Sequence, residues 1–434
     1  MQRAEGGRWS AVTLTLLLGA CSFAPKLKTP DIPSGDAYKE VGPWTQAQPA
    51  DRLPRDAWWG LYGTPEIEAL EKQLIVGNPS LAAAFANYAR ARALSDQARA
   101  GLFPTLGLNA SVGRTRESLN APLRGPTTPT YYDSNTLGGT VSYELDLWGQ
   151  IRNEVAAGEA NAAASAADLE NARLSLIAQL VDDYIQLRSL DRDSAILDDT
   201  VKSYTHALSL TEQRHNAGIA AGLDVSQAQT QLDVARSQAA QTLAQRALME
   251  HAIAALLGVS ASTFSIEPKV VDVELPHIPS GIPATLLQRR PDIAAAQRRM
   301  IAANANIGVA RAAYFPTLTL GAQGGFQSTS FSNWLSAPSS YWAIGPNALL
   351  SVFDGGLRRA QVAQARAEFD ASAANYRGVV VGAFQQVEDS LASLNHYYDA
   401  AVQEKAAVDA AQRTLNLSTA LYSQGATDYL TVIT

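Results

Sequence analysis

The side chains that could do chemistry are few and lie far apart along the chain. The five histidines, none of which has a partner at the spacing of zinc ligands, are His206, His215, His251, His277 and His396. The single cysteine, Cys21, excludes an internal disulfide and a cysteine-based zinc site. The sequence has no glycine-rich phosphate loop and no recognisable nucleophile motif. We therefore predict no catalytic residue, no metal, no cofactor and no enzyme.

Cys21 itself ends a segment typical of a bacterial signal peptide. Two arginines precede residues 11–20, AVTLTLLLGA, an apolar stretch too short to span a bilayer. The sequence "LGAC" then resembles the bacterial lipobox. This predicts a signal peptide at 1–20 and lipidation of Cys21; the alternative is an ordinary cleavage site beside a chance cysteine. Ser22 follows where aspartate would oppose sorting to the outer membrane.

The residues after Cys21 and the overall charge set further limits. Pro25, Pro30 and Pro33 predict that 21–55 is an extended tether and not a packed element. The formal net charge is −7, and no basic patch occurs. A nucleic-acid partner is therefore not expected.

The elements that follow occur twice, which decides the domain organisation. Matching phrases stand 212, 206 or 207 positions apart in the same order. They are NPSLAAA (78–84) with RPDIAAA (290–296), LFPTLGL (102–108) with YFPTLTL (314–320), LWGQIR (147–152) with FDGGLR (353–358), and RHNAGIAAGLDV (214–225) with LYSQGATDYLTV (421–432). Self-similarity at a fixed period indicates a repeated structural unit. We predict a first repeat at 56–277 and a second at 278–434.

Each repeat contains two segments in which apolar and polar residues alternate. Alternation over about ten residues is typical of strands that cross a bilayer, although a half-buried soluble sheet has the same pattern. The predicted strands are 104–113 and 138–147 in the first repeat, and 316–327 and 341–353 in the second. The polar segment from Arg114 to Leu137 is expected to be a loop between strands.

A proline-free segment of helical character follows each strand pair. The first predicted long helix is 154–217, about 95 Å long at about 1.5 Å per residue. Ile177, Val181 and Tyr184 have the spacing of a coiled-coil seam. The second long helix is 357–424. Such helices exceed a globular domain, so we expect them to project into water.

Glycines end both long helices. Gly218 and Gly222 break the first, and a returning helix is predicted at 223–257. Gly425 ends the second, where Asp428 could cap a returning helix.

Four strands per chain cannot close a membrane barrel, because the smallest known barrels have eight. A dimer would supply eight strands with a filled interior, whereas a trimer would supply twelve with an open lumen. We choose the trimer, although geometry alone does not exclude the dimer.

These residues resemble the TolC-like outer-membrane efflux proteins, specifically the NodT-type lipoprotein subgroup. The most specific phrase is LLQRRPDIAAAQRRMIAANANIGVARAAYFPTLTL (286–320), and DAWWGLYGTPEIEAL (56–70) and ALMEHAIAALLG (247–258) support it. The resemblance implies an α+β membrane protein in the cell outer membrane. It also implies a homotrimer with a 12-stranded barrel and a periplasmic α-helical coiled-coil tunnel.

The resemblance further implies an exit duct for drugs or other small molecules. The partners would be a periplasmic adaptor protein and an inner-membrane resistance-nodulation-division (RND) transporter. The implied adaptor contacts lie at the tips of the long helices: Gly218, Gly222, Leu223, Val225, Gly425, Tyr429, Leu430 and Val432. A structural coiled-coil envelope lipoprotein or adhesin without a pore is the alternative, but such a protein has no need of four amphipathic strands.

Two departures from the family are expected. Its acidic gate positions after the second turn correspond to Thr431 and Thr434, which leaves Asp224 and Asp428 as the nearby acids. Helix capping explains both aspartates at least as well. Comparison of the repeats also predicts about 31 further residues of returning helix after Thr434, so we expect the chain as written to assemble and export poorly.

Overall fold

The protein is seen here in a computed structural model that describes residues 22–31, 39, 58–120, 125, 127–271, 273, 290–427 and 431–432. These residues belong to two compact units, and the chain passes between the units several times. The first unit comprises Met1–Ile32, Ala86–Ala167 and Asp292–Val379, and the second comprises Pro33–Phe85, Asp168–Pro291 and Val380–Thr434.

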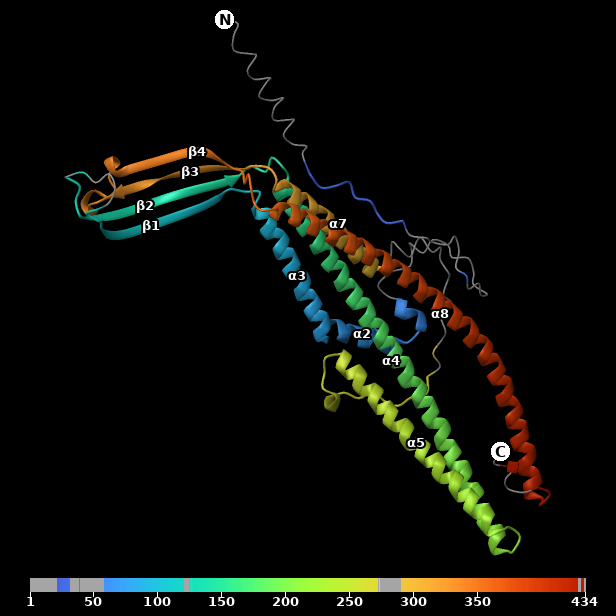
Figure 1. Cartoon of the computed structure of the whole chain (residues 1–434). Helices are drawn as coiled ribbons and strands as arrows, with labels where there is room; N and C mark the ends of the chain where they lie inside the picture. Colours follow the sequence, from blue (N-terminus) through green and yellow to red (C-terminus); the bar gives the residue numbers. More distant parts are fainter. Residues whose placement is uncertain are drawn as a thin grey trace. The chain divides into compact units, whose positions relative to one another are not determined.

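The first unit contains a four-stranded antiparallel sheet. Its strands are β1 (Thr105–Arg116), β2 (Tyr131–Glu144), β3 (Thr317–Ser328) and β4 (Ser340–Leu349). They lie side by side in the order β1-β2-β3-β4 (Figure 1). Each strand therefore pairs with its neighbour in the sequence, and the two predicted strand pairs form one sheet.

The register separates an apolar face of the sheet from a polar face. Leu106 pairs with Val141, Val141 pairs with Ala322, and Ala322 pairs with Ile344. Because directly paired residues share a face, these four side chains define the apolar face. Gly107, Thr140 and Gln323 are paired in the same way on the polar face. The predicted alternation is confirmed.

Four strand ends differ from their predicted positions by three residues or more, among them the end of β2 at Glu144 instead of 147. The segment from Arg114 to Leu137 is not all loop, because the β1–β2 ladder continues through Arg114 opposite Asp133 to Arg116 opposite Tyr131. Polar side chains do not interrupt a backbone ladder, and here they reinforce it: Arg114 lies 3.8 Å from the Asp133 carboxylate, and Arg116 lies over the Tyr131 ring.

A further difference is the end of β4 at Leu349, where the sequence predicts 353. Leu349 pairs with Thr317, the first residue of β3. The next position on β3 is Pro316, which has no N–H to donate.

Helices of the first unit pack closely through small residues. Ala157, near the start of α4 (Gln150–Asn216), forms a buried cluster with Ala302 and Ala305 of α7 (Pro291–Ala312). A Cβ placed on Gly158 would lie 3.3 Å from the backbone of Ser95 in α3 (Pro79–Ala100). The alanine-rich start of α4 thus packs against two helices.

The segment after Cys21 packs against the same helices, which corrects part of the predicted unpacked tether. The ring of Phe23 stacks on Phe315 with 4.6 Å between centroids. Arg311 donates a hydrogen bond to the Phe23 carbonyl, and Asn304 donates one to the Pro25 carbonyl. Proline does favour extended backbone here, but the stacked Phe23 ring and the hydrogen bonds from α7 hold that backbone against the helices. Cys21 lies outside the described residues.

The second unit has the main hydrophobic core. Ile177, Val181 and Tyr184 of α4 are buried as the predicted seam requires. They belong to one cluster with Leu74 of α2 (Pro65–Gly77) and Ile253 of α5 (Gly222–Leu256). A short 3-10 helix, Trp58–Tyr62, lies against this cluster.

A buried ionic cluster joins α4 to α5. Asp191 accepts hydrogen bonds from Arg188 at 2.8 Å and from Arg246 of α5 at 2.6 Å. The same two arginines donate to the carbonyls of Glu267 and Ile266. The cluster therefore holds the extended segment after α5 against the two helices.

Candidate functional site: the tips of the long helices

The tips of the two long helices have the same backbone turn. Gly218 follows α4 with a φ of 74°, and Gly425 follows α8 (Leu357–Ser423) with a φ of 75°. In the first turn Ile219 N–H donates to the Arg214 carbonyl at 2.8 Å, and in the second Ala426 N–H donates to the Leu421 carbonyl at 2.9 Å. A left-handed glycine with such a bond is a standard helix ending, which explains why glycine marks both turns.

Among the predicted tip residues, some face solvent and others pack inward. Gly218, Gly222 and Leu223 are exposed, and Leu223 is accompanied by exposed Ile219. Val225 and Val432 instead pack against the buried cluster of Leu208, Ala228, Leu232 and Tyr422. The tip therefore presents a small apolar surface around Leu223 above a packed interior.

Asp224 is placed as a helix-capping residue. Its carboxylate accepts a hydrogen bond from Ala221 N–H at 3.2 Å, and its own N–H donates to the Ala221 carbonyl. This geometry stabilises the start of α5. Thr431 is exposed. The other predicted tip and gate residues, Asp428, Tyr429, Leu430 and Thr434, lie outside the described residues.

A contact between the two tips was missed by the sequence interpretation. Arg214 near the end of α4 donates to the Tyr422 carbonyl near the end of α8 at 2.6 Å. The Arg214 guanidinium lies 4.5 Å from the centre of the Tyr422 ring, and the Tyr422 hydroxyl lies 3.3 Å from Thr211 Oγ1. A guanidinium over an aromatic face is attracted by the ring's electron density, so this contact fastens the end of α4 to the end of α8.

A weak signal for this contact exists in the sequence. Arg214 stands four positions before Gly218, and Tyr422 stands three positions before Gly425. Both therefore occupy the last turn of their helix, where a cationic side chain is favoured by the helix dipole. Position alone gives no reason for these two residues to meet, because they are 208 positions apart.

Strand-to-helix junctions in the first unit form a second repeated feature. Asp146 is paired with Arg152 at 3.0 Å and accepts the backbone N–H of that arginine. Asp354 is paired with Arg358 in the same way, which lowers the pKa of the Asp354 carboxyl. Each aspartate thus fixes the first turn of a long helix.

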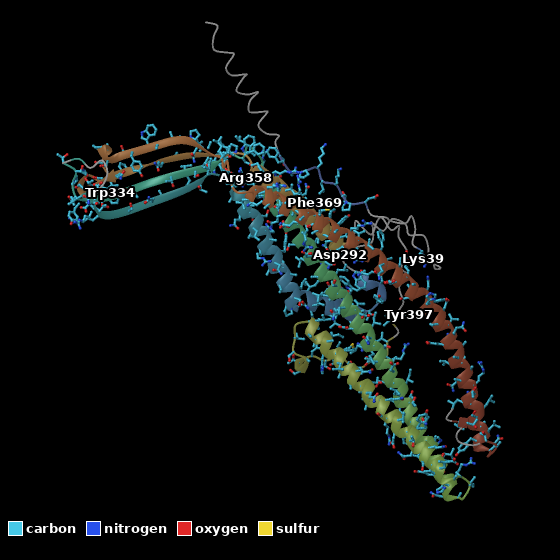
Figure 2. The ribbon with its side chains drawn as sticks, in the orientation of Figure 1. Lys39, Asp292, Trp334, Arg358, Phe369 and Tyr397 are labelled. Atoms are coloured by element: carbon cyan, nitrogen blue, oxygen red, sulfur yellow. The ribbon has the colours of Figure 1, made fainter. Side chains whose placement is uncertain are left out.

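The sheet extends away from this junction. In Figure 2, Arg358 marks the junction end of the sheet, and Trp334 lies in the hairpin loop at the opposite end. Trp148 belongs to the junction too: its ring stacks on Phe315, and its Nε1–H donates to the Pro316 carbonyl at 2.8 Å.

The described residues contain no group of three side chains that could hold a metal ion. Within the same part of the chain, no helix combines the length and the apolar character that a membrane span needs.

Comparison with known proteins places these features in a family. The family model described as "Outer membrane efflux protein" matches residues 70–259 and 282–433. Outer membrane protein OprJ of Pseudomonas aeruginosa is 31% identical over 97% of this chain and 88% of its own length. Probable efflux pump outer membrane protein TtgC of Pseudomonas putida is 29% identical, over 98% of this chain and 88% of its own length.

Solved structures agree with this placement. The outer-membrane channel OprN matches with a TM-score of 0.86 and 30% identity, over 95% of this chain and 92% of OprN. The open state of the MtrE outer membrane channel of Neisseria gonorrhoeae matches with a TM-score of 0.77 and 27% identity, over 95% and 91%. The family model covers more than half of the chain and the fold agrees, so this chain belongs to the outer membrane efflux protein family.

Proposed function

We propose that this protein is the outer-membrane exit duct of a tripartite efflux system. It would pass drugs or other small molecules from an inner-membrane RND pump and a periplasmic adaptor to the exterior. The observation that carries the proposal is a sheet with one apolar, exposed face that continues into two helices of 67 residues each. At about 1.5 Å per residue such helices reach about 100 Å, which suits a structure that leaves the membrane and crosses an aqueous space.

The channel would be a homotrimer with a 12-stranded barrel. β1 and β4 are each paired on one side only among the described residues, and unpaired backbone groups are costly in lipid. Three copies supply twelve strands and an open lumen, whereas two copies supply eight strands and a filled interior. A cyclic homo-oligomer is the usual way to close such a structure.

The tips of the long helices would be the adaptor-docking end and the gate. Exposed Leu223 and Ile219 would offer apolar contact to an adaptor tip, and exposed Thr431 would lie at a position of the family's acidic gate. The Arg214–Tyr422 contact would hold the two repeats together in this region and so keep the end narrow. Asp224 would act as a helix cap.

The outer-membrane end would be reinforced by acylation of Cys21. Ser22, the next residue, donates a hydrogen bond to the Asn153 side chain at 3.1 Å near the start of α4. The predicted acylation would thus fall on the residue that directly precedes this contact in the sequence.

The test is planar-bilayer conductance of the purified lipoprotein. Discrete channel openings are expected, and Arg214→Gln should raise the open fraction because it removes the guanidinium from the Tyr422 ring. Lys202→Gln, a change in an exposed ion pair on the same helix, is the matched control and should leave the openings unchanged. Absence of any channel in the unsubstituted protein would support the structural lipoprotein instead.

A further inference from the structure

The two hairpins of the sheet are equivalent residue by residue. In the first, Thr105 pairs with Ser142; in the second, Thr317 pairs with Leu349. A residue of β3 therefore corresponds to the β1 residue 212 positions earlier, and a residue of β4 to the β2 residue 207 positions earlier. The contact between β2 and β3 thus has an equivalent that the chain does not make with itself: β4 against β1.

The β2–β3 contact contains a glycine pair at which the backbone leaves no room for a side chain on β3. Gly138 pairs with Gly325. A Cβ on Gly325 would lie 2.1 Å from the Leu137 carbonyl oxygen and 2.5 Å from the Gly138 Cα. Any side chain there would collide with backbone, so the two strands approach each other at a glycine pair.

The equivalents of this pair are also glycines, but they lie on the free edges. Gly325 corresponds to Gly113 of β1, and Gly138 corresponds to Gly345 of β4. A Cβ on either residue would meet nothing within 4 Å. No contact among the described residues of this chain therefore requires glycine at these two positions.

We propose that β4 of one copy pairs with β1 of the next copy in the antiparallel register that places Gly345 opposite Gly113. This inference rests on the proposed multi-copy channel and specifies its subunit contact. The occupant of each edge is thus a second copy of this chain, and the glycine pair marks where the two backbones approach.

The faces of the sheet match in this register. Ala348 falls opposite Ala110 on the apolar face, and Asn347 falls opposite Ser111 on the polar face. Continued pairing brings Val352, which is 89% exposed, opposite Leu106, which is 80% exposed. The second copy would therefore pair with the residues after Leu349, for which the β3–β4 ladder has no partner.

Neighbouring registers are worse for separate reasons. A shift of one residue puts every apolar side chain of β4 opposite the polar face of β1. A shift of two residues keeps the faces but separates Gly345 from Gly113. Pro346 supplies no N–H, so one bond is absent from whichever ladder its nitrogen faces.

Paired cysteine substitutions test the register in the outer membrane of cells that express the full chain. Ala348→Cys with Ala110→Cys, and Asn347→Cys with Ser111→Cys, are directly opposite in the proposed register. Opposite Cβ atoms lie about 4.5–5.5 Å apart and diagonal ones about 7–8 Å, so only the opposite pairs approach disulfide geometry. Hydrogen-bonded and non-hydrogen-bonded pairs alternate along an antiparallel ladder, so one of the two cysteine pairs occupies the non-hydrogen-bonded position, where the side chains are closer. After oxidation, covalent dimers and trimers are expected on non-reducing denaturing gels.

The controls distinguish a wrong register from a wrong channel. Ala348→Cys combined with Val112→Cys or with Leu108→Cys tests the registers shifted by two residues, and preferential cross-linking there would overturn the proposed register while leaving the multi-copy barrel. Val141→Cys with Ala322→Cys, which are paired within one chain, should form an intramolecular disulfide and shows that the sheet has folded. If that control oxidises and none of the inter-copy pairs does, both the edge pairing and the proposed barrel fail. Each single substitution should give no covalent oligomer, which excludes pairing through Cys21.

Discussion

The two long helices have the same length but differ in what covers them within the second unit. Along α4, Leu180, Tyr184 and Leu187 are fully buried, and Leu208 packs against Leu232 of α5. Along the part of α8 in this unit, large side chains such as Tyr397 and Leu417 are 73% and 67% exposed. Figure 2 shows Tyr397 on the ribbon of α8.

This difference shows that helix formation and helix anchoring are separate matters here. Alanine-rich, proline-free sequence is enough for 67 helical residues in both cases. Tertiary stability, however, depends on α5, the ionic cluster and the core. Substitutions where α4 packs on α5 should therefore lower the free energy of unfolding strongly, and substitutions on the exposed face of α8 should change it little.

The largest effect should come from Asp191→Ala. This change leaves Arg188 and Arg246 without their shared carboxylate in a buried place, and breaking a buried pair costs about 3–5 kcal/mol. Urea unfolding of the detergent-solubilised protein, followed by helix signal, measures it. Asp199→Ala breaks an exposed pair on the same helix and should cost less than about 1 kcal/mol. Equal losses for the two variants would contradict the assigned role of the cluster.

Leu232→Ala should have the next largest effect. Leu232 is 2% exposed in the tip cluster, and truncating a buried leucine costs about 2–5 kcal/mol. The matched change on α8, Leu417→Ala, should stay within about 0.5 kcal/mol because the side chain is exposed. The same unfolding experiment compares them. A similar loss in both would mean that the face of α8 is covered in solution.

Two glycines at the ends of α4 and α5 allow a finer comparison of substitution costs. Gly258 and Gly218 have similar positive φ values, 72° and 74°, but a Cβ on Gly258 would lie 2.1 Å from the Gly77 carbonyl oxygen, and one on Gly218 would meet nothing within 4 Å. Gly218→Ala should cost about 1–2 kcal/mol from backbone conformation alone. Gly258→Ala should cost measurably more, because backbone must also move. Equal unfolding midpoints for the two variants would show that the backbone at Gly77 moves aside without a loss of stability.

The sequence predicts this fold unevenly, for physical reasons. Local signals are sufficient for the glycine breaks at Gly218 and Gly425 and for the alternation of the strands, since turn conformation and burial act on adjacent residues. Family membership confirms the prediction of an outer-membrane efflux protein and not an enzyme.

Contacts between distant residues were not predictable. The stacking of Phe23 on Phe315 and the contact of Arg214 with Tyr422 join residues more than 200 positions apart, and no local pattern encodes which side chains meet. For the same reason the sequence does not indicate that the predicted tip residues Val225 and Val432 pack inward. The start of β2 at Tyr131 was missed because its polar residues are typical of loops, whereas their partners lie on β1.

The smallest expected effect concerns Asp183 on α4. Burial raises the pKa of its carboxyl, with a smaller contribution from the charge of Asp182, and its Oδ2 has no hydrogen-bond partner among the described residues. The folded protein then holds this proton at a higher pH than the unfolded chain does. Ionised Asp183 therefore opposes folding at neutral pH, and this cost disappears as the pH falls through the folded-state pKa toward the ordinary value.

Asp183→Asn should consequently stabilise the protein at pH 7 by less than about 1 kcal/mol, since the group is partly solvated. The gain should shrink when unfolding is measured near pH 4, because the raised pKa leaves the carboxyl more protonated in the folded state than in the unfolded chain at that pH. Asp182→Asn, the exposed neighbour, is the control and should give a smaller gain. A gain that is equal at both pH values would mean that the amide stabilises α4 by packing or hydrogen bonding. Burial of an ionised carboxylate would then not be a cost that α4 has and the exposed α8 lacks.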